Sequence, residues 1–166
     1  MLIIIFLGLC MAVLGFASLY ASRYRPGKVV DIKPSDYKQI SFLSVAEIEF
    51  LKFLDSFVAG RARIFSKVRI ADVLTPVMSW GSSRWYLAFN RISAKHLDFV
   101  LVDKNYKVIA VIELDDSSHS RPDRKSRDSF VDSIFASVSL PVFHVPVRRN
   151  YLSDDLISLD MVLKRF

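Results

Sequence analysis

The sequence predicts an α/β domain, a mixed sheet flanked by helices, that follows one N-terminal transmembrane helix. Two apolar strands on either side of a tight turn, at residues 97–102 and 107–114, indicate an antiparallel hairpin. Helical patterns precede and follow this hairpin, and a further strand pattern occupies residues 142–147. The resulting order of helix, strand, strand, strand, helix, strand, helix is typical of a small α/β sandwich.

The first 22 residues predict a membrane anchor. Residues 2–21 carry no charge, and about 20 apolar residues cross a bilayer as a helix. Basic residues follow this run and none precedes it, which predicts a single-pass protein whose C-terminal domain is cytoplasmic. A cleaved secretory signal is the weaker alternative, because no basic segment comes before the apolar run. Residues 23–41 are predicted to form a basic linker, and residues 42–166 the α/β domain.

Charge and cysteine content narrow the possible partners. The formal net charge is +6, and the basic residues are spread along the whole soluble part. Anionic lipid accounts only for those next to the anchor, so the sequence predicts nucleic acid as a partner. The single cysteine, Cys10, lies in the anchor, which excludes a disulfide or a thiolate metal site within one chain. Nothing in the sequence indicates an oligomeric state.

A helix is predicted over residues 44–58. Ser44 with Glu47 three residues later has the form of a capping box. The apolar residues that follow at helical spacing are Ile48, Leu51, Leu54 and Val58. Glu47 lies on the same stripe, so it either caps the helix or points toward a pocket. It can do both only if the stripe faces that pocket.

The other elements follow from alternation and from caps. Residues 64–71 alternate with period two and predict the first strand. A short helix is predicted over residues 83–92, and a longer one from residue 120 to about residue 138. Ser153 or Asp154 is expected to cap a terminal helix.

Acidic residues interrupt the hairpin where a sheet is expected to be most apolar. Alternation places Asp98 on one face of the first hairpin strand, and Glu113 with Asp115 on one face of the second. The turn through residues 103–106 brings both sets to the same side, with Asp98 opposite or diagonal to Glu113. Like charges this close persist mainly where a cation lies between them or where their pKa values are split for use. The hairpin therefore predicts a carboxylate pocket.

The pocket predicts a metal site. Asp98 and Glu113 offer the oxygen ligands that Mg²⁺ or Mn²⁺ takes, with positions left for water and a substrate phosphate. Such an ion stabilises the charge that develops on a phosphodiester. His119, in the polar loop after the second strand, is the candidate for proton transfer. Zinc held by His96, His119 and His144 is the less favoured alternative.

Basic residues beside the pocket predict a phosphate-binding surface. Several stand at the start of the second long helix, where side-chain charge and free backbone N–H groups combine. The candidate nucleic-acid-binding residues are Arg91, Lys95, Arg121, Arg124, Lys125 and Arg127. Arg127 also falls on the apolar line of its helix, which predicts an acidic partner. Trp80, Trp85 and Tyr86 either stack on bases or form part of the core or a lid, and the second interpretation is favoured.

The order of the acidic residues resembles that of the PD-(D/E)XK nuclease-like superfamily. Its members carry a helix glutamate, then an aspartate on one hairpin strand and E-x-K on the next. The residues in the same order here are Glu47, Asp98 and Glu113-Leu114-Asp115.

Two finer resemblances lie within this order. The segments Leu97-Asp98-Phe99, Ile112 to Asp116, His119 and Arg127-Asp128 are similar to the D-F, E-x-D-G-x-x-H and R-D motifs of the branch that contains the very-short-patch-repair endonucleases. The sequence is also similar to an uncharacterised bacterial family with F-N-R-I-S-x-K-H-x-D-F and I-E-L-D-D-x-S-H; the matching segments are residues 89–99 and 112–119.

The resemblance implies a restriction-endonuclease-like core over residues 47–151. It implies that Asp98 and Glu113 hold the metal, and that Glu47, Asp115 and His119 complete the catalytic set. The sequence departs from the pattern at Asp115, which takes the position of the usual lysine, so that His119, Lys95 or Arg127 must supply that function. In addition, Asp116 replaces a glycine of the repair-endonuclease branch.

The expected function is that of a magnesium-dependent nuclease, acting on DNA and anchored to the cytoplasmic face of a bacterial inner membrane. The alternative is a nuclease-like domain without catalytic activity, which binds nucleic acid or a protein partner at the membrane.

Overall fold

The computed structural model describes residues 11, 14–16, 18–19, 31–115 and 122–165, with the backbone alone for residues 122–128. The chain divides into two compact units, residues 1–40 and 41–166. The predicted anchor falls mainly outside the described residues. Among the residues that are described, none of the helices combines the length and the apolar character that crossing a membrane requires.

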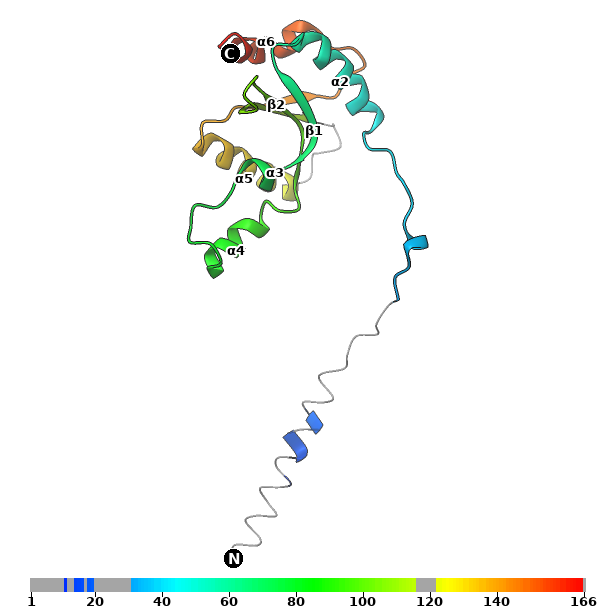
Figure 1. Ribbon diagram of the computed structural model, residues 1–166, viewed down its shortest axis with the longest axis vertical. Coiled ribbons are helices and arrows are strands. Elements are labelled where there is room, and N and C mark those ends of the chain that lie inside the picture. Colours follow the sequence, from blue (N-terminus) through cyan, green and yellow to red (C-terminus); the bar gives the residue numbers. More distant parts are fainter. Residues whose placement is uncertain (1–10, 12–13, 17, 20–30, 116–121, 166) are drawn as a thin grey trace, which may run out of the picture. The chain divides into compact units, whose positions relative to one another are not determined.

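The second unit is built on a four-stranded sheet in the order β1-β2-β3-β4 (Figure 1). Its strands are β1 (Arg63–Arg69), β2 (His96–Val102), β3 (Val108–Asp115) and β4 (Val142–Pro146). The first three strands are antiparallel, whereas β4 is parallel to β3. A parallel pair needs a crossover connection, and α5 (Pro122–Ser137) forms part of it. The predicted α/β class with a mixed sheet is confirmed.

Helices cover both faces of the sheet (Figure 1). On one face, α2 (Val45–Val58) and α6 (Ile157–Leu163), which follows the 3-10 helix η3 (Ser153–Leu156), contribute to a core cluster centred on Phe50 and Phe99. On the other face, α3 (Ile70–Val73) and α5 contribute to a second cluster, which contains Phe135. The sheet is therefore the middle of three layers.

The predicted elements differ from the observed ones in detail. The prediction of a strand to residue 71 is wrong, because β1 ends at Arg69 and α3 begins at Ile70, whose N–H donates to the Lys95 carbonyl at 2.9 Å. On α2, Phe50 is fully buried whereas Ile48 is 39% exposed, so the stripe that faces the core is shifted from the predicted one. The short helix α4 (Ser83–Asn90) begins after a cap at Ser82.

Strands β1 and β2 both change faces at the same point. In a regular strand, residues two or four apart point to the same face. However, Leu97 of β2 packs in the α3/α5 cluster and Phe99 in the α2/α6 cluster. On β1, Val68 likewise packs against the α3/α5 cluster and Ile64 against the α2/α6 cluster. The change coincides with Lys67, which has a φ of 56° and lies between the paired residues of β1. Alternation is therefore broken at the row that contains the candidate site.

Candidate functional site

The candidate site is one row of polar residues that crosses the sheet. Lys67 lies between the pairs Ser66–Phe99 and Val68–Leu97, which places it opposite Asp98. One step beyond the Phe99–Ile112 pair, Asp98 faces Glu113, and Glu113 pairs with His144 on β4. The row therefore reads Lys67, Asp98, Glu113, His144, with one residue from each strand.

Glu47 joins this row from α2. Its N–H and carboxylate form the capping box with Ser44, in which the Ser44 N–H donates to Glu47 Oε2 at 2.6 Å. The other carboxylate oxygen, Oε1, accepts a hydrogen bond from Lys67 Nζ. Glu47 thus performs both of the roles that the sequence left open, because its two oxygens point to different partners.

Lys67 connects the helix to the sheet. Its ammonium group pairs with Glu47 and lies 3.3 Å from Asp98 Oδ1. Burial lowers the pKa of Lys67, but the hydrogen bond to Glu47 and the charge of Asp98 outweigh burial and raise the pKa above its ordinary value. A left-handed backbone at a residue other than glycine costs about 1–3 kcal/mol and is concentrated at functional sites. Among the described residues other than glycine, four have a positive φ, and Lys67, with a φ of 56°, is the one of them that lies within a strand, so its strain coincides with this row.

Lys67 also acts on Glu47. Burial raises the pKa of Glu47, but hydrogen bonds from Lys67 and Ser44 outweigh burial and hold the pKa below its ordinary value. Both members of the pair therefore stay charged near neutral pH.

Asp98 is held from both sides. Oδ1 faces Lys67 Nζ, and Oδ2 accepts a hydrogen bond of 3.0 Å from the Leu114 N–H on β3. The side chain of Asp98 is 19% exposed. These two contacts orient the carboxylate and leave lone pairs on each oxygen for a further ligand.

Glu113 stands in the least favourable electrostatic position of the row. Burial and the facing charge of Asp98 raise its pKa from 4.5 to about 8. Glu113 is therefore protonated at neutral pH unless a cation binds beside it. This pKa reflects burial first, and the facing charge of Asp98 raises it further.

This shift predicts how stability depends on pH. Between about pH 4.5 and pH 8 the folded chain keeps a proton that the unfolded chain has released, so the contribution of Glu113 to stability falls as pH rises through this window. Glu113→Gln removes the effect. We measure the free energy of unfolding of Glu113→Gln minus that of wild type, with metal chelated. We expect this difference to increase by roughly 1–3 kcal/mol between about pH 5 and pH 9. Urea unfolding at both pH values measures this difference.

The matched control is Glu49→Gln. Glu49 is exposed on α2 and pairs only with Lys52 among the described residues. The change with pH that we expect for Glu113→Gln should exceed the change for this control. If Glu113→Gln behaves like this control, Glu113 is not buried beside the Asp98 charge as described.

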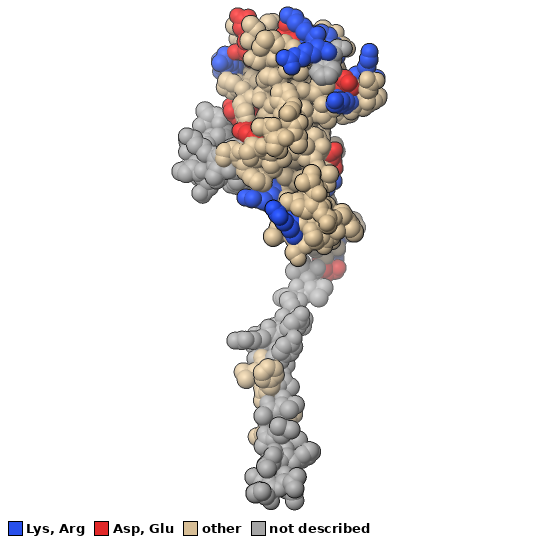
Figure 2. Space-filling model, turned by 90° about the vertical axis from the view of Figure 1, so that its left-hand side faces the viewer, with Lys and Arg blue, Asp and Glu red and all other residues tan. Residues whose placement is uncertain are grey.

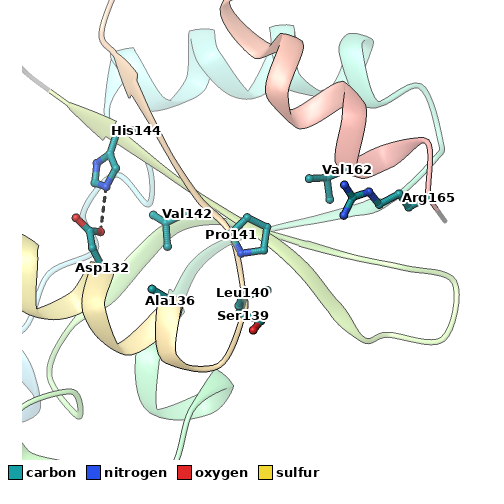
Figure 3. A pocket seen from close by; sticks show the side chains of 9 residues that line it. All are labelled: Asp132, Ala136, Ser139, Leu140, Pro141, Val142, His144, Val162 and Arg165. Atoms are coloured by element: carbon teal, nitrogen blue, oxygen red, sulfur yellow. Dashed lines mark hydrogen bonds and ion pairs between the residues drawn. The ribbon is translucent and has the colours of Figure 1, made fainter.

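His144 lies at the end of the row between two carboxylates. Its Nδ1 is 3.3 Å from Asp115 Oδ1, and its Nε2 is 3.1 Å from Asp132 Oδ1 on α5 (Figure 3). Burial lowers the pKa of His144, but the hydrogen bonds with Asp132 and Asp115 outweigh burial and raise it. Asp115, which was predicted as a catalytic residue, is the last residue of β3. It contacts His144 on β4, and its side chain is 56% exposed.

A groove of about 550 Å³ begins beside His144. It runs along the edge strand β4 between α5 and α6, with Arg165 and Val162 at its other end (Figure 3). Its lining residues are Asp132, Ala136, Ser139, Leu140, Pro141, Val142, His144, Val162 and Arg165. Asp98 and Glu113 are not part of this lining.

The basic residues predicted to bind nucleic acid are only partly described. The Arg91 guanidinium lies over the Phe130 ring at 4.0 Å from its centre, and Lys95 Nζ lies 5.7 Å from the same ring. His119, Arg121 and Asp116 fall outside the described residues, as do the side chains of Arg124, Lys125 and Arg127. The predicted proton transfer by His119, its share in a zinc site and the predicted acidic partner of Arg127 therefore concern residues that the structure does not describe.

The sequence interpretation did not identify Lys67, and it missed the role of Asp132. Lys67 stands in a strand among other basic residues, and no motif marks it. No local signal would have placed it opposite Asp98, because residues 70–95 separate β1 from β2 and form no tight turn that fixes the register of this pair. Asp132 carries no sequence signal, because its contact with His144 depends on how α5 packs against β4.

Comparison with known proteins gives the family. A family described as "protein of unknown function (DUF2726)" matches residues 39–159 of the chain. The chain belongs to this family. The matched segment covers all four strands and the helices α2 to α5, so it contains the complete Lys67, Asp98, Glu113, His144 row. No curated protein and no solved structure was found to match the chain.

Proposed function

We propose that the DUF2726 domain of this chain is a metal-dependent nuclease of the PD-(D/E)XK type, which hydrolyses phosphodiester bonds in DNA. The observation that carries the proposal is the contact of Lys67 with both Glu47 and Asp98. The superfamily pattern needs a lysine beside the acidic residues, and Asp115 stands at its usual position. Lys67 offers the missing ammonium group from β1 instead of β3.

The carboxyl groups fit Mg²⁺ or Mn²⁺. Among the described residues, no three or more His, Cys, Asp or Glu side chains form a metal-binding group. Mg²⁺ is usually bound by only one or two carboxylates, with water and substrate phosphate completing its shell. Asp98 and Glu113 are such a pair, and the raised pKa of Glu113 supports a position that favours a cation. When bound, the ion would polarise the phosphodiester and lower the pKa of a bound water molecule.

The other residues of the site orient these groups. The Leu114 N–H fixes the Asp98 carboxylate, and Glu47 fixes Lys67. An ammonium group has three N–H donors. Among the described contacts, Lys67 directs two of them at Glu47 and Asp98, which leaves the third for an oxygen of the scissile phosphate. Lys67 is thus proposed to stabilise the negative charge that develops there.

We propose the cytoplasmic face of a bacterial inner membrane as the location. This proposal rests on the uncharged run at residues 2–21 and on the basic residues that follow it. Beyond the row, we propose that six basic residues contact nucleic acid: Arg91, Lys95, Arg121, Arg124, Lys125 and Arg127.

One observation favours the inactive alternative. Lys67 Nζ contacts Asp98 directly, so that it neutralises part of the charge that a metal ion would otherwise neutralise. In a domain that binds nucleic acid or a protein without cleaving it, the lysine would replace the ion permanently. The two functions differ in whether a divalent cation binds at all.

Thermal unfolding of the full chain in nonionic detergent tests this point. A ligand that binds only the folded state raises the free energy of unfolding, by about 2.7 kcal/mol at a hundred times its dissociation constant. We therefore expect Mn²⁺ to raise the melting temperature, and Glu113→Gln to remove most of the increase. Asp72→Asn is the control, because Asp72 pairs with Arg69 on the surface. A wild-type chain with no response to Mn²⁺ or Mg²⁺ contradicts the proposed metal site.

A further inference from the structure

The helix α4 and the loop before it form an exposed apolar surface. Val77 is 97% exposed, Trp80 80% and Leu87 70%, and Tyr86 is 49% exposed. No residue of α4 is buried. We call residues 77–89 the α4 surface. Exposed apolar groups gathered in this way mark binding sites more often than isolated ones do.

The rings of the α4 surface support one another. Trp85 stacks on Phe89, with ring centres 4.8 Å apart and an angle of 11° between the planes. The ring centre of Trp80 lies 6.2 Å from that of Trp85, and Tyr86 meets Trp85 edge-on at 5.3 Å. Trp80 is therefore an exposed ring that rests against a partly buried one. A ring held in this way offers a flat face at little entropic cost, which is what a nucleic-acid base stacks on.

The chain segment that carries this surface has charge of one sign. Residues 73–97 contain no Asp or Glu, and their charged side chains are Arg84, Arg91 and Lys95. Arg91 and Lys95 both lie over Phe130 of α5. Figure 1 places α4 at the lower end of the folded domain, and Figure 2 shows Lys and Arg atoms beside uncharged ones at that end. The α4 surface thus combines aromatic rings with cations, which is the combination that binds a polyanion with stacked bases.

From these observations we infer that the α4 surface binds single-stranded nucleic acid. Unpaired bases stack on Trp80 and Tyr86, and Arg84, Arg91 and Lys95 contact the phosphates. A duplex keeps its base faces stacked internally, so it offers the rings no partner along its length. This inference rests on the proposed function, since it names the form of substrate that reaches the same site.

The position of the cations favours nucleic acid over a lipid surface. Along the chain, Arg91 and Lys95 stand between the rings and Asp98. The Lys95 carbonyl accepts the Ile70 N–H, which ties this segment to the end of the sheet where β2 begins. A polyanion that follows this segment from the rings meets the two cations before it reaches β2, so this order suits it. A membrane surface also accepts Val77, Leu87 and the two exposed rings, but it does not require that order.

Tryptophan fluorescence tests the inference directly, because the two tryptophans of the chain, Trp80 and Trp85, both belong to the α4 surface. The full chain in nonionic detergent is titrated with single-stranded oligothymidine and with a duplex of the same length, with EDTA present so that no cleavage occurs. We expect quenching by the single strand and about tenfold weaker binding of the duplex. Equal affinity for both forms, or no quenching by either, overturns the inference.

Two variants separate stacking from apolar contact. Trp80→Leu keeps an apolar side chain but removes the ring, and we expect it to weaken binding of fluorescein-labelled oligothymidine about tenfold in an anisotropy titration. Tyr37→Ala, which removes an aromatic side chain that is 73% exposed in the other unit, is the control and should bind as wild type does. Unchanged binding by Trp80→Leu overturns the inference.

The lipid alternative has its own outcome. In the full chain reconstituted into vesicles of phosphatidylcholine and phosphatidylglycerol, a blue shift of the tryptophan emission that oligothymidine does not reverse would assign the α4 surface to the membrane and overturn the inference. Binding is measured with EDTA, so a failure of this inference is seen without any cleavage assay. A failure of the proposed function would look different: the wild-type chain would bind oligothymidine but would not cleave it when Mg²⁺ is restored.

Discussion

Asp98→Ala is expected to abolish metal-dependent cleavage of nucleic acid, with a loss of about a thousandfold or more in rate. Asp98 is the residue on which the row converges, because it faces Glu113 on one side and Lys67 on the other. Its removal leaves a metal ion with one carboxylate and leaves Lys67 without one of its two acidic partners. The measurement is the initial rate of cleavage of labelled DNA by the full chain with Mg²⁺ or Mn²⁺.

Two controls accompany this variant. Asp98→Asn preserves the size of the side chain and an oxygen for the Leu114 N–H, so it tests the charge with less disturbance of the fold. Asp72→Asn removes a surface carboxylate outside the row and should keep the wild-type rate. Cleavage that persists unchanged in Asp98→Ala would exclude the assigned site, even if the protein proves to be a nuclease.

Lys67→Met is expected to lower the cleavage rate about a hundredfold, as the removal of one donor to a developing negative charge does in other enzymes. It should also lower the free energy of unfolding by about 1–3 kcal/mol, because Glu47 and Asp98 then lose their cation in a partly buried position. Cleavage assays and urea unfolding measure the two effects separately. Lys67→Arg retains the charge, so it should recover most of the stability.

The same variant distinguishes the active from the inactive function. If Lys67 permanently replaces a metal ion, neither wild type nor Lys67→Met cleaves DNA, and Lys67→Met gains a stabilising response to Mn²⁺ that wild type lacks. If Lys67 assists catalysis, wild type responds to Mn²⁺ and cleaves DNA, and the variant responds to Mn²⁺ but cleaves slowly. A Lys67→Met chain with the full wild-type rate would exclude Lys67 from the reaction.

Much of the hairpin could be predicted from sequence, since its determinants are local. The turn after Val102 is held by Asp103, whose carboxylate accepts the N–H groups of Asn105 and Lys107 at 2.8 Å. The turn pairs Val102 with Val108, and a shift of register between Leu101 and Val102 then sets Asp98 opposite Glu113. The capping box at Ser44 is equally local, because its partners are three residues apart. The predictions for His119 and Arg121 concern residues that the structure does not describe.

The residues that complete the row depend on contacts between distant segments. Lys67 and Glu47 are 20 residues apart in the chain. They meet because α2 packs against the sheet and because the Lys67 side chain, on a backbone with positive φ, points toward α2. His144 and Asp132 meet because α5 crosses back beside β4. Alternation assumes a regular strand, so it cannot locate the point at which β1 and β2 change faces. Local pattern therefore determined the hairpin strands, the cap at Ser44 and the presence of acids on both hairpin strands. The expected cap at Ser153 or Asp154 is wrong, because neither residue caps a helix and the terminal helix α6 begins at Ile157 after the 3-10 helix η3. The packing of the layers decided which cation stands beside the acids, because a side chain's partner across two layers is set by tertiary contacts and not by its neighbours in the chain.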